Sequence, residues 1–146
     1  MAATAIRAAV KARIVTDLTA ALKTVAVSNG WPGRNLERDH VWVDRVTGTV
    51  QFPLMMAGRK HRDDKFTVRV IFQSSQPGDS IAETDVRAEE LYAALENVIA
   101  ADPGVGTMDG IVHALIDTVE GPMGELTDEG AVSFMFADVS VHARLI

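Results

Sequence analysis

Four histidines are the residues best suited to chemistry, because the chain has no cysteine and therefore no thiolate nucleophile or thiolate metal ligand. They are His40, His61, His113 and His142, and no two of them stand in an H-x-x-x-H or H-E-x-x-H relation. His113 and His142 fall in the predicted final hairpin, where Asp117 or Asp138 could join them in a metal site or an acid–base pair. Isolated histidines in strands more commonly make structural hydrogen bonds, so we predict no catalytic residue and no metal site.

The remaining chemical motifs are incomplete. No G-x-S-x-G nucleophile elbow occurs in the sequence. The glycines of residues 104–110 form G-x-G-x-x-x-G, which is one residue longer than the dinucleotide fingerprint. They also leave a helix and enter a strand, the reverse of the order that phosphate binding needs. The acids of residues 125–129 lack the spacing of a calcium loop. We therefore expect a protein that is not an enzyme and that binds no cofactor.

A strand followed by a helix is the clearest structural pattern in the sequence. Four apolar residues alternate with polar ones over 64–73, which predicts a strand with one buried face: Phe66, Val68, Val70 and Phe72. After a Pro77-Gly78 turn, Ser80 and Glu83 form a capping box that starts a helix. Its apolar stripe has the helical period, and the helix ends at residues 102–104, Asp-Pro-Gly.

The other elements are predicted from the same two periods. A helix over 4–27 comes first, and two strands over 40–46 and 49–56 then flank a Thr47-Gly48 turn. Pro53 indicates an edge position or a bulge. Residues 111–119 form a strand whose first half is apolar on both faces, which favours a central place in the sheet, and a long acidic connection follows over 121–130. This order predicts an α+β fold in two layers, with a mainly antiparallel sheet of about five strands packed on two helices as α-β-β-β-α-β-β.

The last strand, over 131–145, changes the parity of its apolar row. The even-numbered residues Val132, Phe134 and Phe136 precede the odd-numbered residues Val139, Val141, Ala143 and Leu145. Because side chains alternate between the two faces of a strand, one extra residue is needed to bury the whole row on one face. We therefore predict a β-bulge or a sharp bend near Ala137-Asp138.

Length and composition favour one domain over residues 1–146, large enough to bury a core without disulfides. The N-terminus does not resemble a secretory signal and no apolar run could span a membrane, so we expect a soluble protein.

The net charge of −6 hides a division: residues 1–72 carry 12 Lys or Arg and 6 Asp or Glu, whereas residues 73–146 carry 2 Lys or Arg and 14 Asp or Glu. The basic part of one copy could meet the acidic part of another copy or of a partner. Alternatively, the two parts interleave in space and the charges mix. The acidic part also argues against a protein whose main task is to grip nucleic acid.

Two sets of charged residues are candidate contact surfaces. The first is a basic segment between predicted strands, which faces a partner or a DNA-filled channel as an arm unless it is only a solvated loop: Arg59, Lys60, His61, Arg62 and Lys65. The second combines the basic flank of the first helix with the acidic hairpin connection, as inter-subunit or neck contacts: Arg7, Lys11, Arg13, Glu125, Asp128 and Glu129. A solvated helix face and a solvated hairpin tip are the alternatives for this second set.

Three segments carry a resemblance to a known family: Asp64–Gln73 (DKFTVRVIFQ), Asp85–Ala100 (DVRAEELYAALENVIA) and Val132–Leu145 (VSFMFADVSVHARL). With the order of elements, they resemble the tail terminator proteins of long, non-contractile phage tails and the wider group of small tail-completion and neck proteins. The resemblance implies a structural protein of the virion tail or neck, assembled in the host cytoplasm, that caps the finished tail tube as a ring of about six copies. Its partners would be further copies of itself, the major tail tube protein and a neck or head-completion protein, while genomic DNA passes through without sequence-specific binding.

Other interpretations stay open on the sequence alone. A head-completion or stopper protein would share the two-layer construction. A small α+β enzyme or ligand-binding domain would use the sheet face or the region of His113 and His142. A nucleic-acid binder would use Arg7, Lys11, Arg13 and the segment 59–62, with an affinity that falls steeply with salt.

Overall fold

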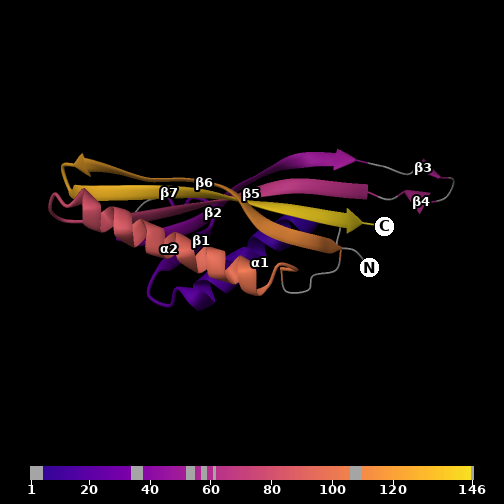
Figure 1. Cartoon of the computed structure of the whole chain (residues 1–146), viewed down its shortest axis with the longest axis horizontal. Helices are drawn as coiled ribbons and strands as arrows, with labels where there is room; N and C mark the ends of the chain where they lie inside the picture. The colour runs from indigo at the N-terminus through magenta and orange to yellow at the C-terminus, as the bar shows by residue number, and fades with distance from the viewer. Residues whose placement is uncertain are drawn as a thin grey trace.

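The computed structural model describes residues 5–33, 38–51, 55–56, 59–60, 62–105 and 110–145. In chain order its elements are α1 (Ile6–Ala21), β1 (Ala26–Asn29), β2 (Asp39–Gln51), β3 (Met55–Met56), β4 (Arg59–Lys60), β5 (Arg62–Gln76), α2 (Ile81–Ala101), β6 (Ile111–Thr127) and β7 (Gly130–Leu145). Five strands form one sheet in the order β1-β2-β5-β7-β6, and β3 pairs with β4 beyond one end of it (Figure 1). The predicted α+β class and its order of helices and strands are confirmed.

The molecule has two layers, because both helices lie on the same side of the sheet (Figure 1). α2 runs along the half that ends in the β6–β7 turn, and α1 lies under the other half beside β1. The sheet is strongly twisted, so that the order of its strands in Figure 1 reverses from one end to the other. We call the side under the helices the covered face and the opposite side the open face.

The core lies between the covered face and the helices. The central strand β5 supplies Phe66, Val68, Val70 and Phe72, all buried as predicted. The helices contribute one buried stripe each: Ile6, Val10, Ile14 and Leu18 from α1, and Ala88, Leu91, Leu95 and Ile99 from α2. Full burial of one such side chain contributes roughly 1.5–3 kcal/mol, so this aliphatic layer is the main source of stability.

The predicted start and end of α2 are confirmed. The amide of Glu83 donates to Ser80 Oγ at 3.4 Å, as a capping box requires. The amide of Asp102 donates to the carbonyl of Val98 at 3.2 Å and closes the last turn. Between these ends, Thr84 is buried at a hydrogen-bonding distance of 2.7 Å from Ser133 on β7, which fixes the helix against the sheet.

The first helix is shorter than predicted. It ends at Ala21 rather than near residue 27, and the chain then forms β1, which pairs in parallel with residues 40–43 of β2. Thr24, Val25 and Val27 are β-branched and fit a strand better than a helix. Val25, in the bend just before β1, is buried in the core, and Val27 of β1 packs against it. The apolar period that suggested a longer helix therefore comes partly from residues that follow the helix.

The predicted turn at Thr47-Gly48 is wrong, because both residues lie inside the single strand β2. Gly48 pairs with Phe66 of β5. A Cβ on Gly48 would lie 2.5 Å from Phe66 Cα, so the glycine permits a close approach of two strands rather than a reversal. One irregularity between Val43 and Val46 shifts the register of this pairing. The sheet therefore has five strands, as predicted. β1 is an additional strand, and the two strands predicted on either side of Thr47-Gly48 are the single strand β2.

The strand over 111–119 is at an edge of the sheet, not at its centre. β6 also continues to Thr127, so the predicted long connection over 121–130 is mostly strand and the turn is Asp128-Glu129. Its register against β7 shifts at three places, between 111 and 113, between 116 and 118, and between 120 and 123. Such irregularities and a proline inside a strand are typical of an edge, where the partner ladder is missing on one side.

The bulge predicted near Ala137-Asp138 is also wrong. β7 pairs with β5 in one unbroken register from Ala131 to Leu145. Its odd-numbered residues from 131 to 143 are buried throughout, and the even-numbered Phe134 and Phe136 lie half-buried on the open face. The open face has its own apolar cluster, in which Trp31 contacts Trp42 with ring centroids 4.9 Å apart. The apolar residues of β7 therefore change from even to odd numbers because both of its faces carry apolar side chains, and no extra residue is needed.

Within the described part of the chain, neither helix combines the length and the apolar character that crossing a bilayer requires. The predicted edge position or bulge at Pro53 lies outside the described residues, as does Gly106.

Candidate assembly surfaces

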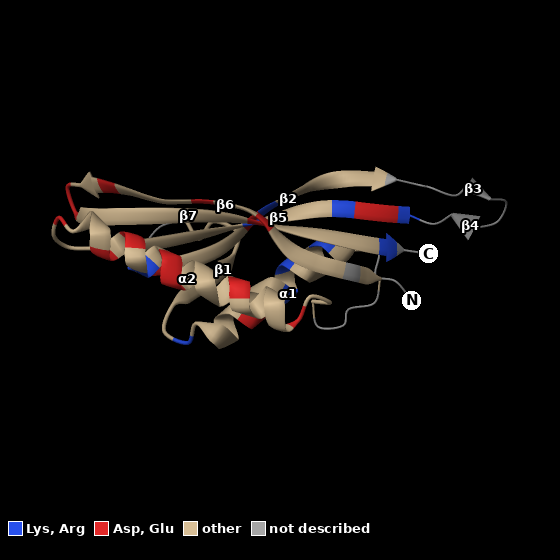
Figure 2. Cartoon of the chain, in the orientation of Figure 1, with Lys and Arg blue, Asp and Glu red and all other residues tan. Residues whose placement is uncertain are grey.

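The opposite charges of the two parts of the chain stay apart in the sheet. β1, β2 and β5 come from the first part of the chain and form one side of the sheet, whereas β7 and β6 come from the second part and form the other side. Figure 2 shows Asp and Glu at the β6–β7 turn and along α2, and Lys and Arg on α1. At the opposite end of the sheet, β5 carries Lys and Arg on either side of Asp, and β7 ends with Arg. The strands of the two parts do not interleave, so the division in sequence is also a division in space.

The β6–β7 hairpin is the acidic surface. Residues 111–143 contain six Asp or Glu and no Lys or Arg. The predicted contact residues Glu125, Asp128 and Glu129 are exposed here, with Glu125 on β6 and the other two in the turn. Four apolar side chains of β6 are between 41% and 57% exposed: Leu115, Val119, Met123 and Leu126. Exposed apolar side chains along both faces of an acidic edge are typical of a contact surface rather than of a solvated loop.

The basic residues predicted on the first helix have partners within the chain. Arg7 donates through Nε and Nη2 to the carboxylate of Asp64, at 3.0 and 2.7 Å. This hydrogen bond and the charge of Asp64 outweigh desolvation and raise the pKa of Arg7. Arg13 lies 3.1 Å from Asp17 one turn later in α1, and Lys11 is half-buried. Arg7 therefore ties α1 to β5, which leaves the rest of this flank for outside contacts.

The predicted basic arm is partly described. Arg59 and Lys60 form β4, which pairs with Met55 and Met56 of β3. His61 lies outside the described residues, and Arg62 begins β5. Lys65 is an exposed residue of β5, one strand in from the edge. β3 and β4 therefore form a small two-stranded sheet beyond the end of the main sheet (Figure 1).

The open face is crossed by one network of polar side chains. Arg69 on β5 donates to the Asp138 carboxylate on β7 at 3.0 Å, and Thr118 on β6 donates to the same carboxylate at 2.8 Å. Burial opposes the ionisation of Asp138, but these hydrogen bonds and the charges of Arg69 and Arg45 outweigh it and lower its pKa. A shallow groove of about 310 Å³ runs beside this network between Arg45 of β2 and Asp117 of β6. The network joins three strands and leaves the groove between them polar.

His113 and His142 lie next to each other, as predicted, with ring centroids 5.9 Å apart. The nearby carboxylate is Asp63, 3.5 Å from His142 Nε2, and neither Asp117 nor Asp138 takes this place. Asp63 also accepts a hydrogen bond from Arg144 at 3.0 Å, and this bond is the main cause that lowers its pKa. No group of three metal-ligating side chains occurs among the described residues. The pair is therefore a structural contact at the ends of three strands.

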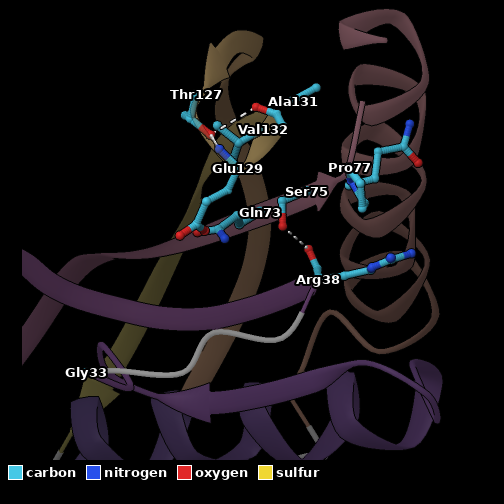
Figure 3. Close-up of a pocket in the computed structure, with 11 residues that line it drawn as sticks. Gly33, Arg38, Gln73, Ser75, Pro77, Thr127, Glu129, Ala131 and Val132 are labelled. Atoms are coloured by element: carbon cyan, nitrogen blue, oxygen red, sulfur yellow. Dashed lines mark hydrogen bonds between the residues drawn. The ribbon is translucent and has the colours of Figure 1, made fainter. Parts of the chain in front are cut away.

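A cleft lies where the acidic hairpin meets β5. It has a volume of about 630 Å³ and is lined mostly by small or uncharged residues, with Arg38 and Glu129 as its charged groups. The hydroxyl of Ser75 donates to the carbonyl of Arg38 at 3.1 Å, and Thr127 Oγ1 accepts from the amide of Glu129 at 3.2 Å (Figure 3). These bonds satisfy the polar groups within the chain. They do not resemble a nucleophile with its base, so the cleft offers shape rather than chemistry.

Sequence patterns missed the apolar row of β6 and the acidic Asp117 and Glu120 beside it. Their exposure depends on the position of β6 at the edge, which follows from tertiary pairing. The one available signal was Gly121-Pro122 inside a predicted hairpin, because proline within a strand favours an edge.

No protein-family model matches the sequence, and no curated protein sequence is similar to it. Among solved structures, the fold is similar to a chain of the "Virion of native gene transfer agent (GTA) particle", with a TM-score of 0.59 and 13% sequence identity. The similarity covers 98% of this chain and 100% of that one. At this identity the match shows that the two chains share a fold over their whole length.

Proposed function

We propose that this chain is a structural protein of a phage-like virion, which closes into a ring on the finished tail tube, ends its polymerisation and forms the joint to the head. The observation that carries the proposal is the whole-length similarity in fold to a chain of a gene transfer agent virion. The similarity covers 98% of this chain and 100% of that chain, so the proposal rests on the whole fold rather than on one part of it.

The two unlike sides of the sheet support a ring. A ring of identical subunits needs a heterologous contact, in which one surface of a subunit meets a different surface of the next. This chain has a basic and an acidic side, separated by the order of its strands. Opposite potentials would favour the correct side-by-side orientation and disfavour contact of like sides.

The proposed mechanism is steric and electrostatic. A subunit ring that occupies the end of the tube would block addition of further tube subunits and present a different surface to the neck. A net charge of −6 would keep such a ring from holding the DNA that slides through it. We propose about six copies per ring, a tail tube protein on one side and a neck protein on the other.

Electron microscopy of tails made with and without this chain tests the proposal. Loss of a terminator would give tails of abnormal length that lack heads. Tails of normal length with intact ends in its absence would overturn termination. Mixing the purified chain with tail tubes or with filled heads then separates a terminator from a head-completion or stopper protein, since each would be retained by a different structure.

The small β3–β4 sheet provides a second test, since we propose that its basic residues contact the tube or the neck. Replacing Arg59, Lys60 and Arg62 with Ser should reduce the yield of joined particles while changing the melting temperature only slightly, since Arg62 is half-buried at the start of β5 and outside the hydrophobic core. Lys23→Ser, in the turn after α1, is the matched control for lost positive charge at an exposed site. Wild-type yields with the triple variant would show that the small sheet makes no contact.

A further inference from the structure

The sheet has two free edges, and they differ. Among the described strands β6 pairs only with β7, so its other side is free except at Ala114, whose amide donates to the carbonyl of Pro103 at 2.7 Å. At the opposite side of the sheet, β1 covers only residues 40–43 of β2. Residues 44–51 of β2 therefore form a second free edge among the described strands. A free edge presents unpaired backbone groups and invites pairing with another chain.

The β6 edge has exposed apolar side chains on both faces, whereas its glutamates lie on the open face. Leu115 and Met123 pair with Ser140 and Phe134 on the open face. Val119 pairs with Ala137, which belongs to the core, so its side chain lies on the covered face, and Leu126 lies there opposite Ala131. Glu120 pairs with Phe136 on the open face, and Glu125 lies on that face opposite Val132. Neither glutamate has an ion pair among the described residues.

Residues 44–51 of β2 contain one base, Arg45, and one acid, the half-buried Asp44, so the positive charge at this edge also depends on Lys65 of the neighbouring β5. Val50 pairs with Asp64 on the covered face and is 45% exposed, and Val46 pairs with the core residue Val68. On the open face, Lys65 of β5 lies opposite Thr49 and is exposed. Arg45 is exposed as well and lines the open-face groove. The two edges are therefore complementary. Val119 and Leu126 would meet Val46 and Val50 on the covered face, and on the open face Glu120 and Glu125 would meet Arg45 and Lys65, with Leu115 and Met123 beside them.

We propose that the β6 edge of one copy docks against residues 44–51 of β2 in a second copy. This inference rests on the proposed ring, and it assigns the surfaces that would build it. Each copy would use its β6 edge once and its β2 edge once. Because the two surfaces differ, the contact repeats from copy to copy until the ring closes. Burial of the apolar rows would supply stabilisation, and the charges would fix the orientation.

Side chains rather than a long backbone ladder would set the register of this contact. The irregularities of β6 divide its free edge into short regular runs, and the longest is 123–127. Pro122 also lacks an amide hydrogen to donate. Interrupted edges of this kind resist unspecific pairing, so the exposed apolar row does not by itself lead to open-ended aggregation.

A charge exchange between the two edges tests the proposal. Glu120→Arg with Glu125→Arg reverses the acidic edge, and Arg45→Glu with Lys65→Glu reverses the basic edge. Each pair alone should weaken self-association about fivefold or more, since like charges would then face each other. The four substitutions together should restore it. Glu89→Arg with Asp79→Arg, at exposed sites on α2 and in the turn before it, is the control for an equal change in net charge outside both edges.

Sedimentation equilibrium measures the association of the purified chain, and incorporation into particles measures it in assembly. Failure of the fourfold variant to recover while each pair weakens association would overturn the contact. Equal behaviour of all variants and wild type would overturn it too. Both measurements need only the full chain and its producing cells.

Cross-linking separates this arrangement from a symmetric one. The chain has no cysteine, so Val119→Cys and Val50→Cys can be joined by a short bifunctional maleimide in concentrated protein and in particles. We expect a ladder of multimers only when both cysteines are in one chain. Dimers from Val119→Cys alone would show that two β6 edges pair with each other, and no ladder in either preparation would also overturn the proposal. Glu89→Cys with Val50→Cys is the matched control.

The cross-linking experiment and the electron microscopy of tails test different claims. A ladder together with tails of normal length in the absence of the chain would keep the contact and reject termination. Tails of abnormal length without a ladder would reject the contact and keep termination.

Discussion

Each face of the sheet holds an ion pair between an arginine and an aspartate, but the two pairs differ in how far they are buried. On the covered face, Arg7 binds Asp64 and lies over the ring of Phe66 at 5.5 Å. On the open face, Arg69 binds Asp138 and lies over the ring of Phe136 at 5.4 Å. The aspartate side chain is 4% exposed in the first pair and 21% exposed in the second.

The degree of burial therefore decides what each ion pair contributes to the stability of the protein. A charge removed from water costs free energy unless a partner compensates it, so a buried pair is costly to break even when it adds little net stability. A pair near the surface is screened and contributes little. The covered pair therefore fastens a helix to the sheet, whereas the open pair leaves a surface that stays polar and accessible.

The largest contrast between the faces is expected from their phenylalanines. Phe72→Ala removes a fully buried ring from the central strand and should lower the free energy of unfolding by about 3–5 kcal/mol. Phe136→Ala, on the open face, should cost less than half of that, because its ring is already partly in water. Urea titration followed by circular dichroism measures both. Equal losses would show that the open face is as much a core as the covered one.

Breaking the two ion pairs gives the next effect. Arg7→Ala leaves the buried Asp64 carboxylate without its partner and should lower the free energy of unfolding by about 2–3 kcal/mol, less than for a fully enclosed pair because Arg7 is itself partly exposed. Arg69→Ala should cost about 1 kcal/mol or less.

Replacing both members of the covered pair is the control for that comparison. Arg7→Met with Asp64→Leu removes the charge together with its partner, so it should recover most of the loss. A double variant as unstable as Arg7→Ala would mean that the packing of the arginine stem, not the unpaired carboxylate, causes the loss.

Local patterns were enough to predict part of this fold. The alternation over Phe66–Phe72 and the Ser80–Glu83 capping box depend on residues close in sequence, and both are confirmed. The position of β1 depends on parallel pairing with β2, which a short apolar segment cannot reveal. Gly48 shows the same limit, because a glycine that permits close strand approach has the same sequence signature as one in a turn.

The open face accounts for most of the other differences. Val132, Phe134 and Phe136 pointed to a bulge because a single buried face was assumed, whereas the sheet carries apolar residues on both. For the assembly surfaces, the exposure of the acidic residues near 125–129 could be predicted from charge. The edge position of β6 and the internal partner of Arg7 could not, because each depends on a residue distant in sequence, such as Asp64.

Trp31 covers part of the open face, where no helix packs, and its removal allows a further comparison of the two faces. Trp31 is 57% exposed, whereas Trp42 behind it is only 4% exposed. Trp31→Ala should cost about 0.5–1.5 kcal/mol through the lost aromatic contact. Since the chain has two tryptophans, the variant reports Trp42 alone, and its fluorescence should become accessible to acrylamide. Quenching as weak as for a buried tryptophan would show that other residues shield Trp42.

The smallest effect is expected from acid, and it also distinguishes the faces. The pKa of Asp138 is lowered in the folded protein, chiefly by the hydrogen bond from Arg69 against the opposing effect of burial. A carboxylate whose pKa is lower when folded stabilises the protein above its unfolded pKa, about 4, and loses that contribution as the pH falls through the folded value. Because Asp138 is partly exposed, the contribution should be less than about 1 kcal/mol. Asp138→Asn should therefore lower the free energy of unfolding at pH 7, and the curves of variant and wild type should come together as the pH falls through the folded pKa of Asp138.

Asp79→Asn, at an exposed carboxylate in the turn before α2, is the control and should leave the acid limb of the stability curve unchanged. An Asp138→Asn curve parallel to wild type from pH 7 to pH 2 would mean that the network on the open face does not hold this carboxylate in its ionised form.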